Sequence, residues 1–148
     1  MKKILSLVLC LALLASVTAF AAAEVSPVVA EKAMAYFADY DGSKVVIKAP
    51  DLFAKIDAGE EMLILDIRQP DAYAESHLAG AINVPFGMAI VENLSKIPDD
   101  VQIYVYCYTG QTASQTTAIL RLLGYDAYNL SGGFINGWTA KGYEGVTD

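Results

Sequence analysis

The chain has 148 residues, 55% of them hydrophobic, and its 17 acidic and 10 basic side chains give a formal net charge of −7. This length allows one domain with a hydrophobic core of its own. The acidic balance argues against nucleic acid or an anionic membrane as the protein's partner.

The first 23 residues have the layout of a secretory signal peptide. Lys2 and Lys3 give a positive start, residues 4–14 form a near-continuous apolar stretch, and small residues precede the first acidic one. We expect cleavage after Ala21 or Ala23 and therefore export, to a periplasm if the cell has two membranes and otherwise by secretion or membrane attachment. Loss of both lysines changes the net charge from −7 to −9.

Two other interpretations of this segment stay open. In the first, residues 4–23 are retained as an anchor, since they nearly reach the roughly 20 apolar residues that a membrane-spanning helix needs. In the second, Cys10 carries a lipid, although Leu9 stands where a lipoprotein signal usually has a small residue. The alanine-rich end favours cleavage, after which we expect no membrane partner.

A helical extension and a domain of alternating patterns follow the predicted signal. In the extension, residues 24–44, apolar side chains recur on a helical period over 27–40. In the domain, residues 45–142, short apolar runs alternate with helical patterns. The expected strands are residues 45–47, 62–65, 81–84, 101–106 and 127–130. The expected helices are residues 50–58, 69–76, 86–94 and 112–123, with a short one leading from the glycine pair 132–133 towards 138.

The alternation of strands and helices predicts an α/β fold with a mostly parallel sheet. The strands are continuous apolar runs, as expected where helices cover both faces of a sheet. Functional sites in such sheets form at the carboxyl ends of strands. Asp66 and Cys107 each stand at such an end.

Cys107 is the only cysteine after the predicted signal, so it has no partner for an internal disulfide. It is a buried inert residue, an intermolecular bridge or a reactive thiol, and its surroundings favour the last. A six-residue loop, CYTGQT, leads from a strand to a helix; Gly110 permits a positive φ, and Thr112 is the candidate N-cap. Inward-facing amides and the helix dipole would form an anion cradle that stabilises a thiolate.

Four motifs resemble those of rhodanese domains, in order and at similar separations: LDIR (65–68), HLAGAINVP (77–85), YCYTGQTA (106–113) and LSGGFINGW (130–138). The resemblance covers about residues 45–142 and implies a rhodanese-like α/β domain, with a mostly parallel sheet of about five strands and helices on both faces. It also implies sulfurtransferase activity, in which Cys107 takes sulfane sulfur as a persulfide and passes it to a nucleophilic acceptor. By that correspondence, the cradle consists of Tyr108, Thr109, Gly110, Gln111 and Thr112.

The loop departs from the family pattern in its charge. Many active rhodaneses have Arg or Lys in the loop, often directly after the cysteine, where this chain has Tyr108. Thiosulfate is a dianion that an acidic protein repels, so we expect a less charged donor, such as polysulfide or another persulfide. Relatives that act on phosphate have a longer loop ending in an arginine. Ala113 occupies the position six after the cysteine here, which argues against phosphatase activity.

Asp66 and Arg68 are interpreted as a structural pair. In the family that the chain resembles, such a pair braces the loops around the site. We expect Arg68 to pair with a nearby carboxylate, such as Asp71 or Glu75, rather than to take part in catalysis.

The remaining marked residues have supporting roles in this interpretation. His77 is the only histidine, and the resemblance implies that it orders the loop by hydrogen bonds rather than acting as a base. Gly132 and Gly133 are expected to form a wall of the pocket. Tyr106 and Tyr108 are expected on opposite sides of the chain, one of them shielding the sulfur. One histidine and one cysteine give no metal-ligand spacing, and we expect no cofactor.

Three hypotheses follow. The first is an exported sulfurtransferase that moves sulfur from a small donor to a thiol or cyanide-like acceptor, with a protein as a further candidate acceptor. The second is a sulfur carrier without turnover, or a protein-binding rhodanese-like module. The third is a thiol-redox role or an intermolecular disulfide through Cys107.

Overall fold

A computed structural model describes residues 25–38 and 40–147, so the predicted signal segment and its cleavage sites lie outside the described residues. The described residues divide into two units, one ending at Glu31 and a larger one beginning at Lys32. The predicted extension contains a helix, α2 (Pro27–Ala38). None of the helices in the two described stretches combines the length and apolar character needed to cross a membrane.

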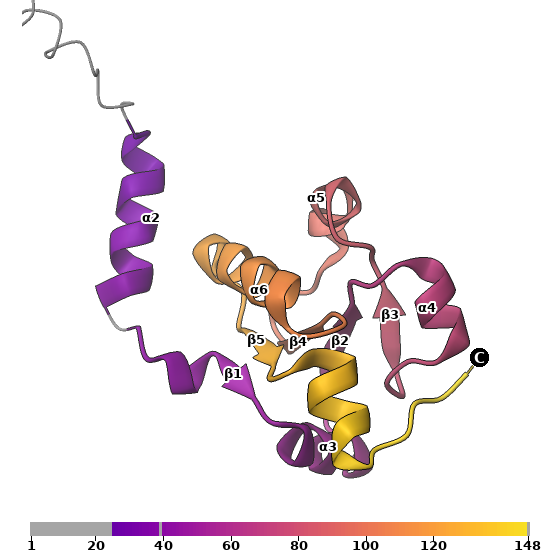
Figure 1. Ribbon diagram of the computed structural model, residues 1–148. Coiled ribbons are helices and arrows are strands. Elements are labelled where there is room, and N and C mark those ends of the chain that lie inside the picture. Colours follow the sequence, from indigo (N-terminus) through magenta and orange to yellow (C-terminus); the bar gives the residue numbers. More distant parts are fainter. Residues whose placement is uncertain (1–24, 39, 148) are drawn as a thin grey trace, which may run out of the picture. The chain divides into compact units, whose positions relative to one another are not determined.

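A five-stranded parallel sheet forms the centre of the larger unit (Figure 1). Its strands lie in the order β1-β5-β4-β2-β3, and each neighbouring pair is parallel. Their bounds are β1 Val46–Ile47, β2 Met62–Asp66, β3 Ala81–Asn83, β4 Gln102–Tyr106 and β5 Ala127–Leu130. The predicted α/β class and parallel sheet are confirmed, and all five carboxyl ends lie at one edge.

Helices connect the strands and cover the sheet (Figure 1). The helices are α3 Ala49–Asp57, α4 Pro70–Glu75, α5 Met88–Asn93, α6 Gln111–Leu123 and a π-helix, η4, Gly133–Trp138. Short 3-10 turns are η2 Gly42–Lys44, η3 Leu94–Lys96 and η5 Thr139–Lys141. The helix α6 ends at Gly124, whose φ of 104° closes the last turn with a conformation that glycine adopts at low cost.

Two hydrophobic clusters, one on each side of the sheet, form the core. Side chains alternate along β4, so Tyr104 and Tyr106 enter one cluster, and Ile103 and Val105 enter the other. Cys107 continues this alternation into the second cluster. The first cluster includes Leu52, Leu78, Leu130, Phe134 and Trp138. The second includes Leu65, Ile67, Ala113, Leu120 and Ala127.

At two helix starts a glycine explains the difference from the prediction. Gly87, with a φ of 124°, precedes α5, so this helix begins at Met88 rather than at residue 86. Gly110, with a φ of 91°, is the N-cap of α6, so the expected N-cap Thr112 already lies in the first helical turn. In both cases a glycine makes the sharp change of direction, and no side-chain cap is present.

Candidate active site

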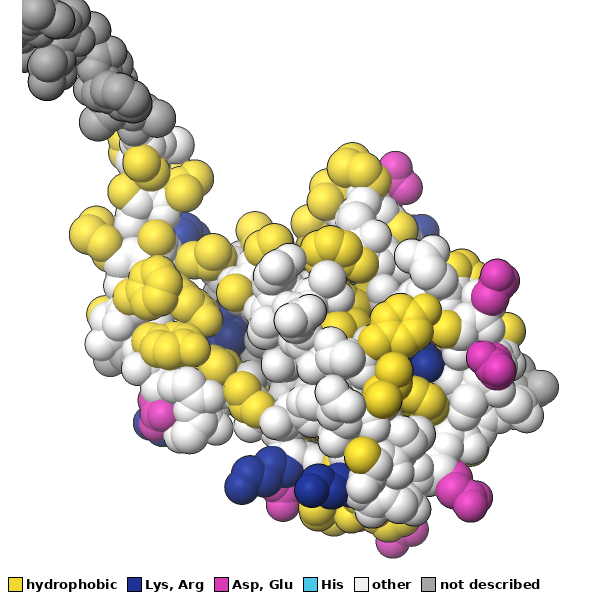
Figure 2. All heavy atoms as spheres, in the orientation of Figure 1, with side chains coloured by type: hydrophobic (Ala, Val, Ile, Leu, Met, Phe, Trp, Pro, Cys, Tyr) yellow, Lys and Arg dark blue, Asp and Glu magenta, His cyan; other side chains and the backbone are white. Residues whose placement is uncertain are grey.

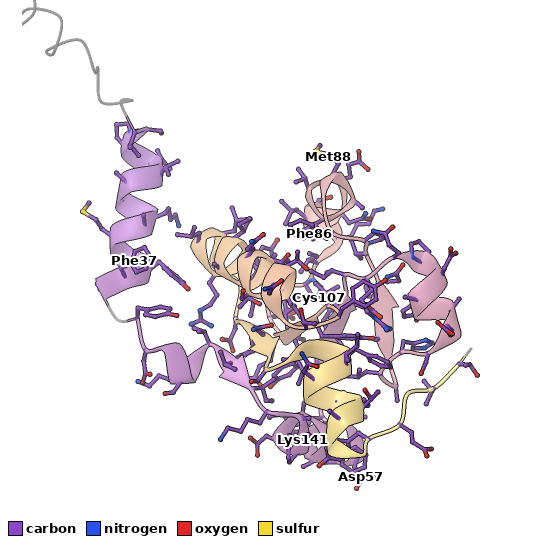
Figure 3. The ribbon with its side chains drawn as sticks, viewed as in Figure 1. Phe37, Asp57, Phe86, Met88, Cys107 and Lys141 are labelled. Carbon is purple, nitrogen blue, oxygen red and sulfur yellow. The ribbon has the colours of Figure 1, made fainter. Side chains whose placement is uncertain are left out.

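Cys107 directly follows β4 at the carboxyl edge of the sheet (Figure 3). Its side chain is 4% exposed and packs with the cluster that includes Ala113 and Leu120 of α6. The first turn of α6 begins four residues later, at Gln111. The sulfur therefore lies below the surface, close to the positive end of a helix dipole.

Backbone amides of the loop converge on the sulfur. The amide of Gly110 donates a hydrogen bond to Cys107 Sγ over 3.2 Å. Gly110 can turn its amide inwards because its φ is 91°, a conformation that residues with a Cβ rarely adopt. Its carbonyl accepts the first bond of the helix, from the Ser114 amide at 2.9 Å.

The surroundings of Cys107 stabilise the thiolate form more than those of an ordinary cysteine do. Burial raises the pKa of the thiol, but hydrogen bonds from the Thr112 hydroxyl and from the amides of Ala113, Thr109 and Gly110 outweigh it, so the pKa is lowered overall. Thr112 contributes in this way because its hydroxyl is not used as a helix cap. A lowered pKa increases the thiolate fraction, and the thiolate is the nucleophilic form of cysteine.

The segment after β5 supports the loop from behind. Phe134 and Ile135 donate their amides to the carbonyls of Cys107 and Tyr108, at 2.8 and 2.9 Å. Gly133 makes this approach feasible, because a Cβ there would lie 2.5 Å from the Cys107 carbonyl oxygen and 2.7 Å from the Gly110 amide nitrogen. This glycine therefore acts as a support for the loop backbone.

Gly132 has a different role from its neighbour. Its φ is 75°, and a Cβ there would lie 2.7 Å from the amide nitrogen of Gly137. It lets η4 begin with a tight turn and contacts that helix's own backbone. The Cβ position of Gly133 therefore faces the cysteine loop and that of Gly132 faces η4, although the amide nitrogens of both glycines lie near Gly110.

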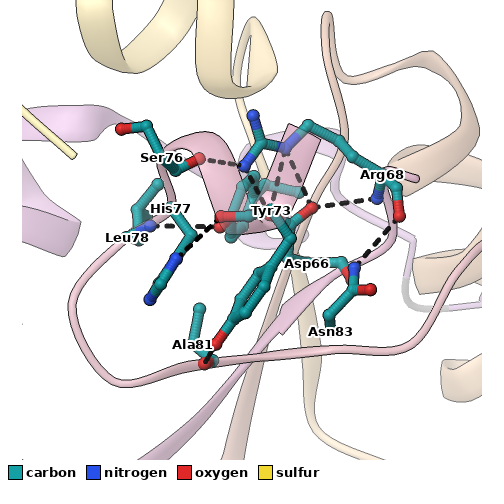
Figure 4. A network of polar contacts seen from close by, with 9 residues as sticks. Asp66, Arg68, Tyr73, Ser76, His77, Leu78, Ala81 and Asn83 are labelled. Atoms are coloured by element: carbon teal, nitrogen blue, oxygen red, sulfur yellow. Dashed lines mark hydrogen bonds and ion pairs between the residues drawn. The ribbon is translucent and has the colours of Figure 1, made fainter. Parts of the chain in front are cut away.

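Asp66 and Arg68 form a buried ion pair with each other (Figure 4). Arg68 Nη2 lies 2.6 Å from Asp66 Oδ2, and Nη2 also donates to the carbonyl of Ser76 at 2.6 Å. The expectation of a partner such as Asp71 or Glu75 was wrong. Asp66 is the partner because the chain turns directly after β2, and Asp66 also accepts the Arg68 amide at 2.9 Å.

Three aromatic rings surround the guanidinium group of Arg68. Its central carbon lies 4.0 Å from the ring centre of Phe134, 5.4 Å from that of Tyr106 and 5.8 Å from that of Tyr108. The prediction that the two tyrosines lie on opposite sides was therefore wrong, because residues two apart in an extended chain share a face. Tyr106 is fully buried, whereas Tyr108 is 41% exposed.

His77 lies in the turn after α4. Its Nδ1 is 2.9 Å from the carbonyl of Tyr73, and the two rings stack with centroids 3.9 Å apart. Its backbone pairs with Val146 in both directions, at 2.9 and 2.7 Å. The next residue, Leu78, donates its amide to the Tyr106 hydroxyl at 3.1 Å, which connects this turn to the residue before Cys107. A direct bond from the His77 side chain to the cysteine loop stays a prediction.

Sequence and structure comparisons agree with this geometry. A sequence profile of the Rhodanese-like domain matches residues 49–141, more than half of the chain. The chain belongs to the rhodanese-like family. A sulfurtransferase of Allochromatium vinosum is 31% identical over 97 residues, which cover 65% of this chain and 89% of the relative. The thiosulfate sulfurtransferase PspE of Escherichia coli is 33% identical over 70 residues, covering 47% of this chain and 67% of PspE.

Other relatives extend well beyond this rhodanese-like domain. The putative sulfur carrier protein YrkF of Bacillus subtilis is 25% identical over 88 residues, and the match covers 59% of this chain but only 46% of YrkF. The chain thus spans less than half the length of that relative. Among solved structures, a rhodanese-related protein of Thermoplasma volcanium has a TM-score of 0.63 at 27% identity, covering 70% of this chain and 98% of that one. At the family level, these matches support a rhodanese-type sulfurtransferase.

Two supports of the site were missed from the sequence. The first is the pair of amides at Phe134 and Ile135, which hold the loop carbonyls. The second is the Asn83 side chain, which donates to the carbonyls of Asp66 and Arg68 at 2.9 and 3.0 Å. The motif LSGGFINGW pointed to the first region, but no pattern in a single sequence indicates which backbone amides meet. No three His, Cys, Asp or Glu side chains in the described parts of the chain gather as metal ligands would.

Proposed function

We propose that this protein is an exported sulfurtransferase in which Cys107 carries sulfane sulfur as a persulfide. The observation that supports this most is the convergence of hydrogen-bond donors on Cys107 Sγ, with a lowered pKa of the thiol as the result. The same donors would stabilise the terminal sulfur of a persulfide, which is also anionic.

Sulfur transfer would proceed in two displacements. In the first, the Cys107 thiolate attacks a terminal sulfur of a hydropolysulfide monoanion, the S–S bond of the donor breaks, and Cys107 persulfide and a hydropolysulfide monoanion shorter by one sulfur are formed. In the second, an acceptor thiolate attacks the outer sulfur and the S–S bond at Cys107 breaks. The acceptor becomes a persulfide, and Cys107 returns to the thiolate. Neither displacement needs a cofactor, and the leaving groups carry away the electrons of the broken bonds.

Polysulfide is the proposed donor in preference to thiosulfate. The loop from Cys107 to Thr112 contains no cation, and the charge of the nearby Arg68 is balanced by Asp66 at 2.6 Å. Nothing in this arrangement offers a free positive charge to the sulfonate end of thiosulfate. The excess of acidic side chains repels that dianion further.

Mass spectrometry of the intact protein tests the proposal. A Cys10→Ser background leaves Cys107 as the only thiol in the chain. Incubation with inorganic polysulfide is expected to add one sulfur that a reductant removes, and Cys107→Ser in the same background is expected to add none. Faster loading by polysulfide than by thiosulfate supports the donor assignment, and a wide preference for thiosulfate contradicts it.

Turnover distinguishes the enzyme from the alternative, a sulfur carrier or binding module. The presence of a sulfur carrier protein among the relatives makes this alternative concrete. Loaded protein is mixed with cyanide or a thiol, and the release of sulfur is followed by mass. Repeated loading and release indicate an enzyme, whereas a stable persulfide that these acceptors do not discharge indicates a carrier.

Export is proposed from the layout of the first 23 residues. Determination of the N-terminal residue of the protein recovered from its producing cells tests this. A start at Ala22 or Glu24 supports cleavage, and an intact first segment contradicts it.

A further inference from the structure

The exposed side chains around Cys107 at the carboxyl edge are mostly uncharged. Among the described residues of the loops after β2, β3, β4 and β5, the charged side chains next to the strand ends are Asp66 and Arg68, which are buried and paired. Several exposed positions there are uncharged, among them Gln69, Phe86, Met88, Tyr108, Gln111 and Ile135, and the first exposed charge after β2 is Asp71 in the first turn of α4. This is unusual in a chain with 27 charged residues, since 17 acidic and 10 basic side chains are distributed over its length.

Four of these side chains are large and apolar, and we call them the apolar rim: Phe86, Met88, Tyr108 and Ile135. Their exposed fractions are 45%, 67%, 41% and 48%. Figure 2 shows mostly uncharged side chains over the area between α5, α6 and η4, with acidic side chains at the margin of this face. Exposed apolar side chains that gather around a recessed reactive group indicate a binding surface.

Two hydrogen bonds and a ring contact connect the segments that carry Phe86, Tyr108 and Ile135. Phe86 donates its amide to the carbonyl of Ile67, the residue before Arg68, at 3.0 Å. The Tyr108 ring lies 5.8 Å from the Arg68 guanidinium, and the Tyr108 carbonyl accepts the Ile135 amide at 2.9 Å. Phe86, Tyr108 and Ile135 thus belong to segments that are joined to one another where β4 ends, and Figure 3 shows Met88 further from Cys107 than Phe86, at the start of α5.

We propose that the apolar rim selects the sulfur acceptor, and that this acceptor is a small thiol with an uncharged, apolar body. This inference rests on the proposed persulfide at Cys107. When the apolar part of such a thiol packs against the rim, it is removed from water, which stabilises the complex. A carboxylate or sulfonate in the same place would lose water without meeting an unpaired cation. Cys107 is only 4% exposed, so a narrow molecule reaches its sulfur more readily than a flat protein surface.

The chemical step is the second displacement described above. The acceptor loses its thiol proton to solvent, and its sulfur attacks the outer sulfur of the Cys107 persulfide. The bond between the two persulfide sulfurs breaks, its electron pair stays on Cys107 as a thiolate, and the acceptor leaves as a persulfide. The rim acts only on the body of the acceptor and takes no part in bond breaking.

Transfer rates to matched thiols test the selection. Full-length protein with Cys10→Ser is loaded with inorganic polysulfide, freed of donor and mixed with phenylmethanethiol or with 2-mercaptoethanesulfonate. Each rate of sulfur loss is corrected for the thiolate fraction and divided by the rate of the same thiol with a small-molecule persulfide. This normalised rate is expected to be about tenfold higher for phenylmethanethiol than for 2-mercaptoethanesulfonate. That factor is the effect of withdrawing roughly two methylene groups from water.

A charge placed on the rim provides the decisive control. Ile135→Lys introduces a cation beside the loop, and we expect it to reduce the preference severalfold and to accelerate the sulfonate thiol. Ile119→Lys introduces the same charge on α6 at a position that is 53% exposed and lies outside the rim. This variant is expected to keep the preference of the parent protein.

The outcomes separate the inference from the proposed function. If Cys107 loads but discharges equally to both thiols, or if Ile119→Lys changes the preference as much as Ile135→Lys, the rim does not select the acceptor. If Cys107 never loads, the proposed function itself fails. A preference for phenylmethanethiol that only Ile135→Lys reduces supports the inference.

Discussion

The two sides of β4 stabilise charge by different means. On one side, Asp66 and Arg68 form an ion pair whose side chains are 0% and 3% exposed, with aromatic rings around it. On the other side, Cys107 lies among backbone amides and one hydroxyl, with no charged side chain in its loop. The alternation of side chains along the strand separates the two arrangements by a single residue.

The ion pair depends on particular side chains, whereas the stabilisation of the sulfur depends mainly on the loop backbone. A buried ion pair depends on two particular side chains, and removing either leaves an uncompensated charge. The amides around the sulfur are present whatever residues the loop contains, provided that its conformation is kept. We therefore expect side-chain changes on the Arg68 side to affect mainly stability and side-chain changes on the Cys107 side to affect mainly the reactivity of the thiol. A change that crowds the loop backbone should affect both.

Asp66→Ala gives the largest expected effect. It leaves the buried guanidinium of Arg68 without its counter-charge, and we expect the free energy of unfolding to fall by about 3–5 kcal/mol. Urea unfolding followed by circular dichroism measures this. The matched control is Glu60→Ala, which breaks the more exposed pair with Lys55 and is expected to cost less than about 1 kcal/mol. Similar losses for both variants would contradict a structural role for the buried pair.

Gly133→Ala acts on the sulfur side through the backbone alone. The new methyl group would meet the Cys107 carbonyl and the Gly110 amide, so the loop must shift. We expect a loss of about 2–4 kcal/mol in unfolding free energy and sulfur uptake slower by roughly tenfold or more. Uptake is measured by intact mass in the Cys10→Ser background.

Gly142→Ala isolates the effect of backbone conformation from that of crowding. Gly142 also has a positive φ, 85°, but a Cβ there would meet no atom within 4 Å. A loss of about 1–2 kcal/mol is expected from the left-handed conformation, with unchanged sulfur uptake. If both alanine variants behave alike, the close approach of Gly133 does not hold the loop in place.

The strand and helix pattern could be predicted because it depends on local features of the sequence. Short, largely apolar runs identified all five strands, and Gly124 marked the end of α6 correctly. The helix starts were less predictable. A threonine is a favourable N-cap in general, but Gly110 makes the turn here, and this leaves the Thr112 hydroxyl for the sulfur.

The partners within the site could not be predicted from residue types. Arg68 has carboxylates on both sides in the sequence, and only the turn after β2 determines that Asp66 is the one it meets. The six residues of the loop include no cation, yet the fold brings Arg68 next to Tyr108 from another loop. Such contacts depend on which loops share the carboxyl edge of the sheet, and spacing along the chain does not reveal this.

Thr112→Val tests the contribution of the one side-chain donor to the sulfur. Valine has nearly the same shape but no hydroxyl, so the pKa of Cys107 is expected to rise. The rate of alkylation by iodoacetamide near neutral pH should fall roughly three- to tenfold, the effect of one hydrogen bond. Thr109→Val is the matched control, since the Thr109 amide is retained, and a comparable decrease there would contradict a specific role for the Thr112 hydroxyl.

The smallest expected effect is the dependence of stability on pH that Cys107 itself contributes. Its pKa is lower in the folded protein than in the unfolded chain, where a free cysteine has a pKa of about 8.5. The unfolded chain therefore binds more protons between the two pKa values, and stability rises with pH across that window. The contribution is complete above the unfolded pKa and is lost as the pH falls through the folded pKa.

The contribution of Cys107 is isolated by subtracting the free energy of unfolding of a variant that lacks this thiol. The tyrosines and lysines, which titrate at higher pH, are present in both proteins and cancel. The free energy of unfolding is measured from pH 6 to about pH 9.5 for the Cys10→Ser protein and for the same protein with Cys107→Ser. The difference between them is expected to increase with pH and then level off above about pH 8.5. A difference that decreases with pH would mean that burial outweighs the hydrogen bonds, so the amide cradle would not activate the thiol. Because no charged side chain of the loop takes part, added salt should leave this difference nearly unchanged, unlike that of an exposed ion pair.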